Sequence, residues 1–474
     1  MRVKHVSRTS CARIPYLPVW CLLAAAAPAG AQAPPPRAFV GATLIDGTGA
    51  AAVANAVVAV RDGRITCAGP RASCPVPAGT ETVDVAGRWI LPGLVDAHVH
   101  YSQTGWADGR PDALDMRERF PYDRTVARLK DPTPFYRSYL CSGVTATYDV
   151  GGFPWTWGLR RPAERDVAAP HVAAAGPLLS TRDHWLNVPA ERQFLHISSD
   201  SAVRTGVHYL VENRTDAIKV WFLVGGSAPD AAEWAARLRL AGEEARRGGL
   251  PLIVHATTLW AATQAVNAGA RLLVHGVTDL PVDEAFIAGA KRAGTVYTPT
   301  LTVRDGYAQL RARKFRAEPY DMACVDPATR AKAFLSDSIS GRPDEATLAR
   351  AAEQAEASFR LEAENLMRVH RAGIPVAMGT DAGNPLTLHG PSVFLEIEAL
   401  ERAGLRPMEV IVAATRNGAL AMGRLGDFGT VEAGKMADLV VVDADPLQAV
   451  RNLRRVSLVV RGGHVHRRAD LEFR

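Results

Sequence analysis

Eight short apolar runs, separated by stretches with helical spacing, constrain the fold of this 474-residue chain more than any other feature. Each run is bounded by glycine or proline and is rich in small and β-branched residues, which is typical of buried strands. The runs cover residues 93–100, 144–150, 171–179, 217–224, 252–256, 272–276, 296–301 and 375–381. Eight strands alternating with helices predict an α/β fold, a (β/α)8 TIM barrel with insertions.

Both ends of the chain have a different, β-rich character. Asp62-Gly63 and Gly462-Gly463 each lie between two apolar runs, as in β-hairpins. We therefore expect both chain ends to form a small β-sandwich domain. Its two parts are predicted at residues 39–91 and 425–470, with the TIM barrel at 92–424 between them.

Residues 1–31 have the features of a secretory signal peptide. They contain four basic residues and no acidic one, followed by a short apolar run that ends in Ala29-Gly30-Ala31. We expect export, with cleavage near Ala31 and a periplasmic or secreted mature protein. The run is too short to predict stable membrane insertion.

The remaining chain carries little net charge. Without residues 1–31 the formal charge falls from +6 to +2, so the sequence does not predict a nucleic-acid partner. Four cysteines remain, and Cys67 with Cys74 form the best candidate disulfide. The sequence leaves the pairing of Cys141 and Cys324 open, because four cysteines allow three full pairings.

Metal-binding side chains recur at the ends of the predicted strands. The carboxyl ends of barrel strands converge on one face, so these side chains are expected to meet there. Four imidazoles and a carboxylate suit zinc or a similar divalent ion. The set consists of His98, His100, His255, His275 and Asp381.

Lys219 lies inside the fourth apolar run and has no evident reason to be there as a charged group. A lysine buried among apolar residues either loses its charge or finds a partner. Its neutral amine can add carbon dioxide to give a carbamate, whose two oxygens can bridge two metal ions. The alternative is a salt-bridged lysine with a structural role.

Several further motifs run along the chain; they are GRWILPGLVDAHVH, GVTATYDVGG, IKVWF, IVHA, LLVHG, GTDAG and GTVEAGKMADLVVVDADP. Together they resemble the amidohydrolase superfamily in its binuclear, carboxylated-lysine form. The resemblance spans about residues 40–466 and includes the branch of imidazolonepropionase-like and Xaa-Pro dipeptidase-like enzymes, with 20 residues from His255 to His275. It implies two divalent metal ions, with zinc expected. One would be held by His98, His100 and Asp381, the other by His255 and His275, with carboxylated Lys219 between them.

The function predicted from these residues is an exported metal-dependent amidohydrolase. A metal-activated hydroxide would cleave a C–N bond of a small-molecule amide or dipeptide, with Asp381 as general base and acid. His184 is a candidate donor to the developing oxyanion. The alternative is a lactone, ester or cyclic-amide hydrolase on the same centre. Deamination is disfavoured, because His255 is followed by Ala-Thr-Thr, whereas the mononuclear deaminases of this superfamily use a His-x-x-Glu element. A non-catalytic binding protein is disfavoured, because every ligand position is filled.

Candidate substrate contacts are less specific. Arg182 and Arg304 are candidates for binding a substrate carboxylate, and the inserted segment 304–350 is either a lid or a surface excursion. A homo-oligomer is compatible with the sequence by analogy with the superfamily alone. Five tryptophans are predicted at or just after strand ends, where they either line a pocket or pack in the core, and Trp221 is the candidate for substrate binding. They are Trp106, Trp155, Trp157, Trp185 and Trp221.

Overall fold

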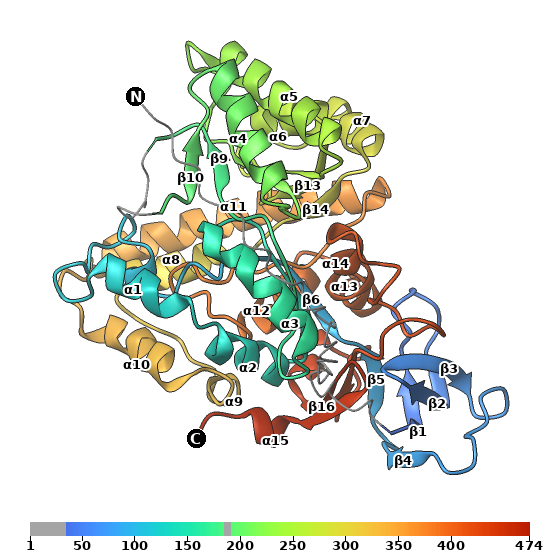
Figure 1. Cartoon of the computed structure of the whole chain (residues 1–474). Coiled ribbons are helices and arrows are strands. Elements are labelled where there is room, and N and C mark those ends of the chain that lie inside the picture. The colour runs from blue at the N-terminus through green and yellow to red at the C-terminus, as the bar shows by residue number, and fades with distance from the viewer. Residues whose placement is uncertain (1–34, 184–190) are drawn as a thin grey trace, which may run out of the picture. The chain divides into compact units, whose positions relative to one another are not determined.

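Two parallel sheets form the middle of the chain in the computed structural model, which describes residues 35–183 and 191–474 (Figure 1). Strands in each sheet run parallel, and helices separate most of them in sequence, as expected of an α/β fold. The first sheet contains β6 (Leu94–Val99), β7 (Val144–Asp149) and β8 (His171–Ala174). The second contains, in spatial order, β10 (Phe194–His196), β9 (Leu178–Ser180), β11 (Ile218–Trp221), β12 (Leu252–His255), β13 (Ala270–Val274) and β14 (Val296–Thr298).

Two of the predicted runs differ from single strands. Residues 171–179 divide into β8 and β9, because Gly176 has φ +63° and Pro177 follows it. Residues 375–381 form no regular strand. Isolated bridges pair Val376 with Tyr297 of β14, and Ala382, directly after the run, with Val99 of β6. This segment therefore lies between β14 and β6, while complete closure of an eight-stranded barrel stays a prediction.

Helices follow the strands and pack against one another in chain order from α4 to α7 (Figure 1). Side-chain caps fix the starts of three of them, since Ser199, Thr258 and Asp283 each accept a hydrogen bond from the first helical turn. The α-helices are α1 (Tyr122–Leu129), α2 (Thr133–Cys141), α3 (Arg160–Arg165), α4 (Asp200–Glu212), α5 (Ala231–Arg247), α6 (Leu259–Asn267), α7 (Glu284–Ala293), α8 (Val303–Arg311), α9 (Pro319–Met322), α10 (Pro327–Leu335), α11 (Glu345–Arg371), α12 (Ser392–Arg402), α13 (Pro407–Ala414), α14 (Arg416–Ala421) and α15 (Arg468–Leu471). Short 3₁₀ helices are η1 (Ala107–Gly109), η2 (Pro154–Leu159), η3 (Ser336–Ser338) and η4 (Val450–Arg454).

Strands from both ends of the chain share one sheet. The antiparallel pair of β5 and β15 joins the two ends, with Leu439 opposite Pro92. Hydrogen bonds link all eight strands in one continuous sheet, in the order β17-β16-β15-β5-β1-β2-β3 with β4 on β1, and the predicted sandwich packing stays a prediction. The strands are β1 (Arg37–Leu44), β2 (Val53–Arg61), β3 (Arg64–Pro70), β4 (Glu81–Asp84), β5 (Trp89–Pro92), β15 (Leu439–Val442), β16 (Val456–Arg461) and β17 (His464–Arg467).

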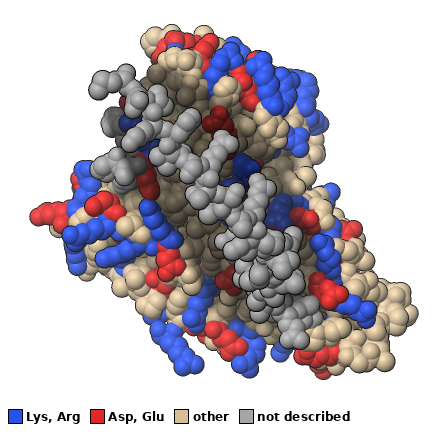
Figure 2. All heavy atoms as spheres, viewed as in Figure 1, with Lys and Arg blue, Asp and Glu red and all other residues tan. Residues whose placement is uncertain are grey.

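Two disulfides and the surface charge complete the fold. The structure joins Cys67 to Cys74, the pair that the sequence favoured, and Cys141 at the end of α2 to Cys324. Basic and acidic side chains are interspersed on the face shown in Figure 2. Among the described residues, no helix combines the length and the apolar character that crossing a bilayer requires.

A buried ionic cluster joins β8 to the sheet formed by the chain ends. His171 is 1% exposed, and its ring nitrogens lie 2.8 Å from Oε2 of Glu164 and 2.7 Å from Oδ2 of Asp438. Arg461 and Arg424 face the same carboxylates, with Nη1 of Arg461 3.9 Å from Asp438 and Nη1 of Arg424 3.2 Å from Glu164. Burial opposes a charge on His171, but Asp438 and Glu164 outweigh it and raise the pKa of the ring.

The raised pKa predicts a pH-dependent stability. Charged His171 stabilises the fold fully below the unfolded pKa of about 6.5, and this contribution is lost as pH rises through the higher folded pKa. His171→Gln should cost about 3 kcal/mol at pH 6, because it removes the charged partner 2.7 Å from buried Asp438, and should flatten the decline above pH 6.5. Urea unfolding from pH 6 to 9 measures both effects. His208→Gln, at an exposed histidine, is the control; an unchanged slope in His171→Gln would contradict the assignment.

Candidate metal centre

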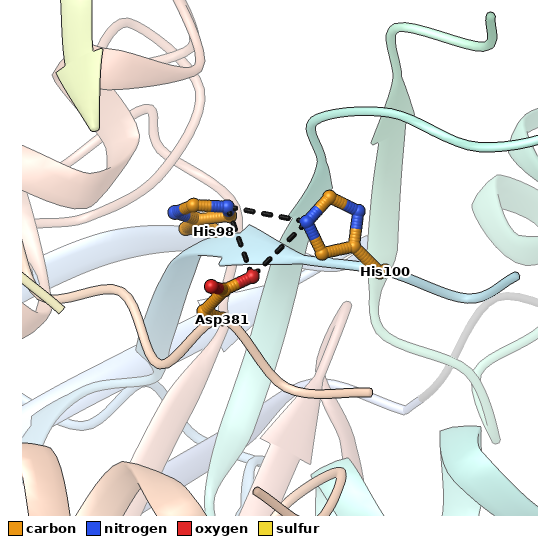
Figure 3. A group of neighbouring side chains, drawn as sticks. All are labelled: His98, His100 and Asp381. Atoms are coloured by element: carbon orange, nitrogen blue, oxygen red, sulfur yellow. Dashed lines mark hydrogen bonds and ion pairs between the residues drawn. The ribbon is translucent and has the colours of Figure 1, made fainter. Parts of the chain in front are cut away.

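Three potential metal ligands converge at the end of β6. His98 and His100 point to the same side, because they are two residues apart at the strand end, and Asp381 approaches them from the segment 375–382 (Figure 3). Nε2 of His98 lies 3.2 Å and Nε2 of His100 lies 3.0 Å from Oδ1 of Asp381, and the two nitrogens are 3.3 Å apart. Among the described residues, buried Oδ1 has no hydrogen-bond donor. Three lone-pair atoms facing one another in this way fit a divalent cation.

The other three predicted ligands line the same cavity of about 230 Å³. His255 ends β12 and His275 follows β13, and their ring centroids are 4.3 Å apart. The His275 ring also lies 5.1 Å from that of His98, which connects the two groups. Lys219 of β11 is 2% exposed, and burial lowers the pKa of its amine to about 7.

Hydrogen bonds to the distal ring nitrogens orient two of the histidines. Nδ1 of His100 donates to the carbonyl of Gly151 at 2.6 Å, which leaves the Nε2 lone pair directed at the cavity. Nδ1 of His275 lies 2.7 Å from Oγ1 of Thr300. Burial also lowers the pKa of His98 to about 4 and that of His275 well below its usual value, so these rings are neutral near pH 7. Neutral imidazole is the form that binds metal.

Backbone conformation aims two of the ligands. His275 has φ +78° and Asp381 has φ +61°, a left-handed region that is uncommon for residues other than glycine. Burial opposes the charge on Asp381, but His98 and His100 outweigh it and hold the pKa of the carboxyl well below its usual value. The carboxylate is therefore ionised in the folded protein.

Asp96 connects the two chain segments that carry the first three ligands. Its fully buried carboxylate accepts hydrogen bonds from Oγ1 of Thr380 at 2.7 Å, from N of Thr380 at 3.0 Å and from N of His98 at 3.3 Å. The residue before Asp381 is thus fixed to β6. In the sequence Asp96 was only the residue two before His98, and its role depends on a partner 284 residues away.

The other sequence-predicted residues fall into different places. Trp221 at the end of β11 and Arg304 at the start of α8 line the cavity, whereas exposed Arg182 is absent from its described lining. His184 and Trp185 lie outside the described residues. Trp106 is fully buried and donates to Ser336 at 2.9 Å, while Trp155 and Trp157 pack against the core, so these three tryptophans do not line the described cavity.

Several cavity residues were not found from the sequence. Arg110 donates to Asn384 and, at 2.7 Å, to Asp112. Tyr307 of α8 donates to Oδ1 of Asn384 at 2.7 Å, and Nδ2 of Asn384 donates to the carbonyl of Asp381 at 3.1 Å. This cluster supports the backbone of Asp381. Only Asn384 carried a signal, since it follows Asp381 by three residues in GTDAGN.

The sequence also matches a known protein family. The model of the amidohydrolase family matches residues 89–466. The chain belongs to the amidohydrolase family. Among curated proteins, the imidazolonepropionase of Mesorhizobium japonicum is 27% identical, covering 85% of this chain and 90% of that protein. This amidohydrolase is thus a hydrolase that acts on carbon–nitrogen bonds.

Solved structures of two other enzymes have a similar fold. A molinate hydrolase superposes with a TM-score of 0.65 at 24% identity, covering 92% of this chain and 95% of its own. A Xaa-Pro dipeptidase with bound methionine in its active site gives 0.64 at 21% identity, covering 91% and 100%. At these identities the likeness concerns the fold, and the substrate of this amidohydrolase is a separate question.

Thr380 provides a test of how the ligand-bearing segments are held. Thr380→Val keeps the shape of the side chain but removes the 2.7 Å hydrogen bond to buried Asp96. We expect a loss of about 1 to 3 kcal/mol in the free energy of unfolding and weaker retention of bound metal. Urea unfolding and metal analysis after dialysis measure these. Thr66→Val, at an exposed strand position, is the control, and equal behaviour of the two variants would refute the bracing role.

Proposed function

We propose that this amidohydrolase is an exported, metal-dependent enzyme that cleaves the C–N bond of a small amide or dipeptide at the centre around Asp381. The observation that carries the proposal is the convergence of His98, His100 and Asp381 within 3.0 to 3.3 Å of one another. The cavity beside them has room for a small molecule rather than a protein chain.

Two divalent ions fit the donor set. His98, His100 and Asp381 would hold one, and His255 and His275 the other. Lys219 would bridge them as a carbamate, formed when its neutral amine adds carbon dioxide and releases a proton; its burial and its pKa of about 7 support this. Ions bound here, with zinc expected from the imidazole-rich set, would acidify a water molecule and polarise the substrate carbonyl.

Asp381 is the residue that would move the proton. Its ionised carboxylate would take a proton from the attacking water as the new C–O bond forms, and would deliver it to the leaving nitrogen as the C–N bond breaks. His184, predicted as an oxyanion donor, lies outside the described residues, and its role stays a prediction.

A second candidate is hydrolysis of a ring amide, lactone or ester at the same centre. It is favoured by the curated relatives, which are imidazolonepropionases, a name that refers to an imidazolone. The same carboxylate and metal ligands would serve, because attack on any of these carbonyls needs an activated water. Parallel assays of dipeptides, ring amides and lactones separate the two candidates.

Metal analysis tests the proposed centre. We expect about two divalent ions per chain, falling to one or fewer in Lys219→Ala together with a loss of hydrolysis of about 10²-fold or more. Lys130→Ala, at a partly exposed lysine paired with Glu191, is the matched control and should keep both ions. One ion that is unaffected in Lys219→Ala would return Lys219 to a structural role, and a metal-free active enzyme would refute the centre.

Export is tested separately. Residues 1–31 support it through their basic start and apolar run, and two disulfides in the described part of the chain are in keeping with an oxidising compartment. We expect protein from the native cell to begin at Gln32 and to be found outside the cytoplasm. Intact-mass measurement of the isolated protein checks the first residue. A cytoplasmic protein that retains residues 1–31 would contradict export.

A further inference from the structure

An ion pair in the cavity wall has two very different members. Nη1 of Arg304, at the start of α8, lies 2.8 Å from Oε1 of Glu362 on α11. The side chain of Glu362 is only 4% exposed, whereas that of Arg304 is 46% exposed. Both residues line the same cavity as the six candidate ligands. The carboxylate is therefore the deep member of the pair, and the guanidinium is the member that a ligand can reach.

Glu362 is fixed in place by its surroundings. It belongs to α11, a helix of 27 residues, and its stem packs on the backbone beside His275. A β-carbon added to Gly276 would meet Cγ of Glu362 at 3.4 Å and Cδ at 3.7 Å. A carboxylate buried this deeply needs a cation or hydrogen-bond donors to offset its lost hydration.

The chain before Arg304 is fixed as well. The carboxylate of Glu396 on α12 accepts hydrogen bonds from N of Leu301 at 2.8 Å and from N of Thr302 at 2.9 Å. The start of α8 is thus held against α12. Only the long side chain of Arg304 is left to adjust, and Glu362 lies at its end.

Most donors of Arg304 remain open to a ligand. A guanidinium has five N–H groups in a planar fork that matches a carboxylate. No described residue other than Glu362 forms an ion pair or hydrogen bond with Arg304. Arg110 is less suited, because its guanidinium is already engaged by Asp112 and Asn384. Arg304 is therefore the cavity arginine with donors to spare.

We propose that Glu362 is a positioning residue that holds Arg304 over the cavity, so that its free N–H groups bind a carboxylate on the substrate. The proposal rests on the proposed function and narrows its substrate class to small amides that also carry a carboxylate. Glu362 itself touches neither the scissile bond nor the substrate. Its effect is to fix the direction of the guanidinium before the substrate arrives, which lowers the cost of ordering it on binding.

A matched pair of substrates tests this, alanyl-proline and alanyl-prolinamide, which share the scissile bond and differ in the terminal carboxylate. The measured quantity is the ratio of kcat/KM for the acid over the amide, in the metal-loaded full-length protein. We expect this ratio to fall about tenfold in Arg304→Gln and in Glu362→Gln, through KM rather than kcat. The double variant should fall no further than either single variant, because the two residues act as one unit.

A control variant changes an ion pair away from the cavity. Glu284→Gln removes a surface partner of Arg368 on α11, 3.6 Å away, and should leave the ratio unchanged. A higher ratio in Glu362→Gln would show that Glu362 only neutralises Arg304, and equal losses with both substrates would show a structural role. Either result, or additive losses in the double variant, overturns the proposal.

A binding measurement keeps the proposal separate from the proposed function. If the wild-type protein hydrolyses neither dipeptide, the shift in Tm caused by each dipeptide still reports binding to the cavity. A larger shift with the acid than with the amide, lost in both single variants, supports the positioning role even though the dipeptidase activity fails. Equal shifts with acid and amide in the wild type overturn it.

Discussion

The approach of the segment 375–382 to β6 is the interaction on which the centre depends. N of Asp381 donates to the carbonyl of His98 at 2.7 Å, and N of His100 donates to the carbonyl of Ala382 at 2.8 Å. Gly379 allows this approach, since a β-carbon there would lie 2.8 Å from Cβ of His98. Residues more than 280 apart in sequence thus share one hydrogen-bonded register, and their side chains meet as a consequence.

Burial then determines the protonation of the centre. His98 and His275 stay neutral because burial penalises the imidazolium, while His98 and His100 hold the pKa of Asp381 well below its usual value. Lys219 follows the same rule, and its amine loses part of its charge near neutral pH. A set of neutral nitrogens around one carboxylate is what a divalent cation needs, so the fold prepares the site before any ion binds.

The same rule acts at a second place with the opposite result. His171 is as buried as His98, yet its pKa is raised, because Glu164 and Asp438 both contact its ring. This cluster joins β8, which is far in sequence from either chain end, to the sheet made by the two chain ends. Whether a buried histidine is a neutral ligand or a charged structural group therefore depends on the number of carboxylates that face it.

Much of this followed from the sequence, because some patterns have a single physical solution. Alternating apolar runs and helices predicted the parallel strands, and histidines at strand ends predicted side chains that meet, since strand ends share one edge. Other features needed the tertiary structure. The sequence suggested a regular strand at 375–381, where the structure has isolated bridges. The Glu362–Arg304, Arg110–Asn384 and Thr380–Asp96 contacts had no local pattern, because the partners are distant in sequence. The sequence by itself determined which side chains could bind metal, and only the tertiary structure decided which polar groups surround them, because that depends on contacts between segments hundreds of residues apart.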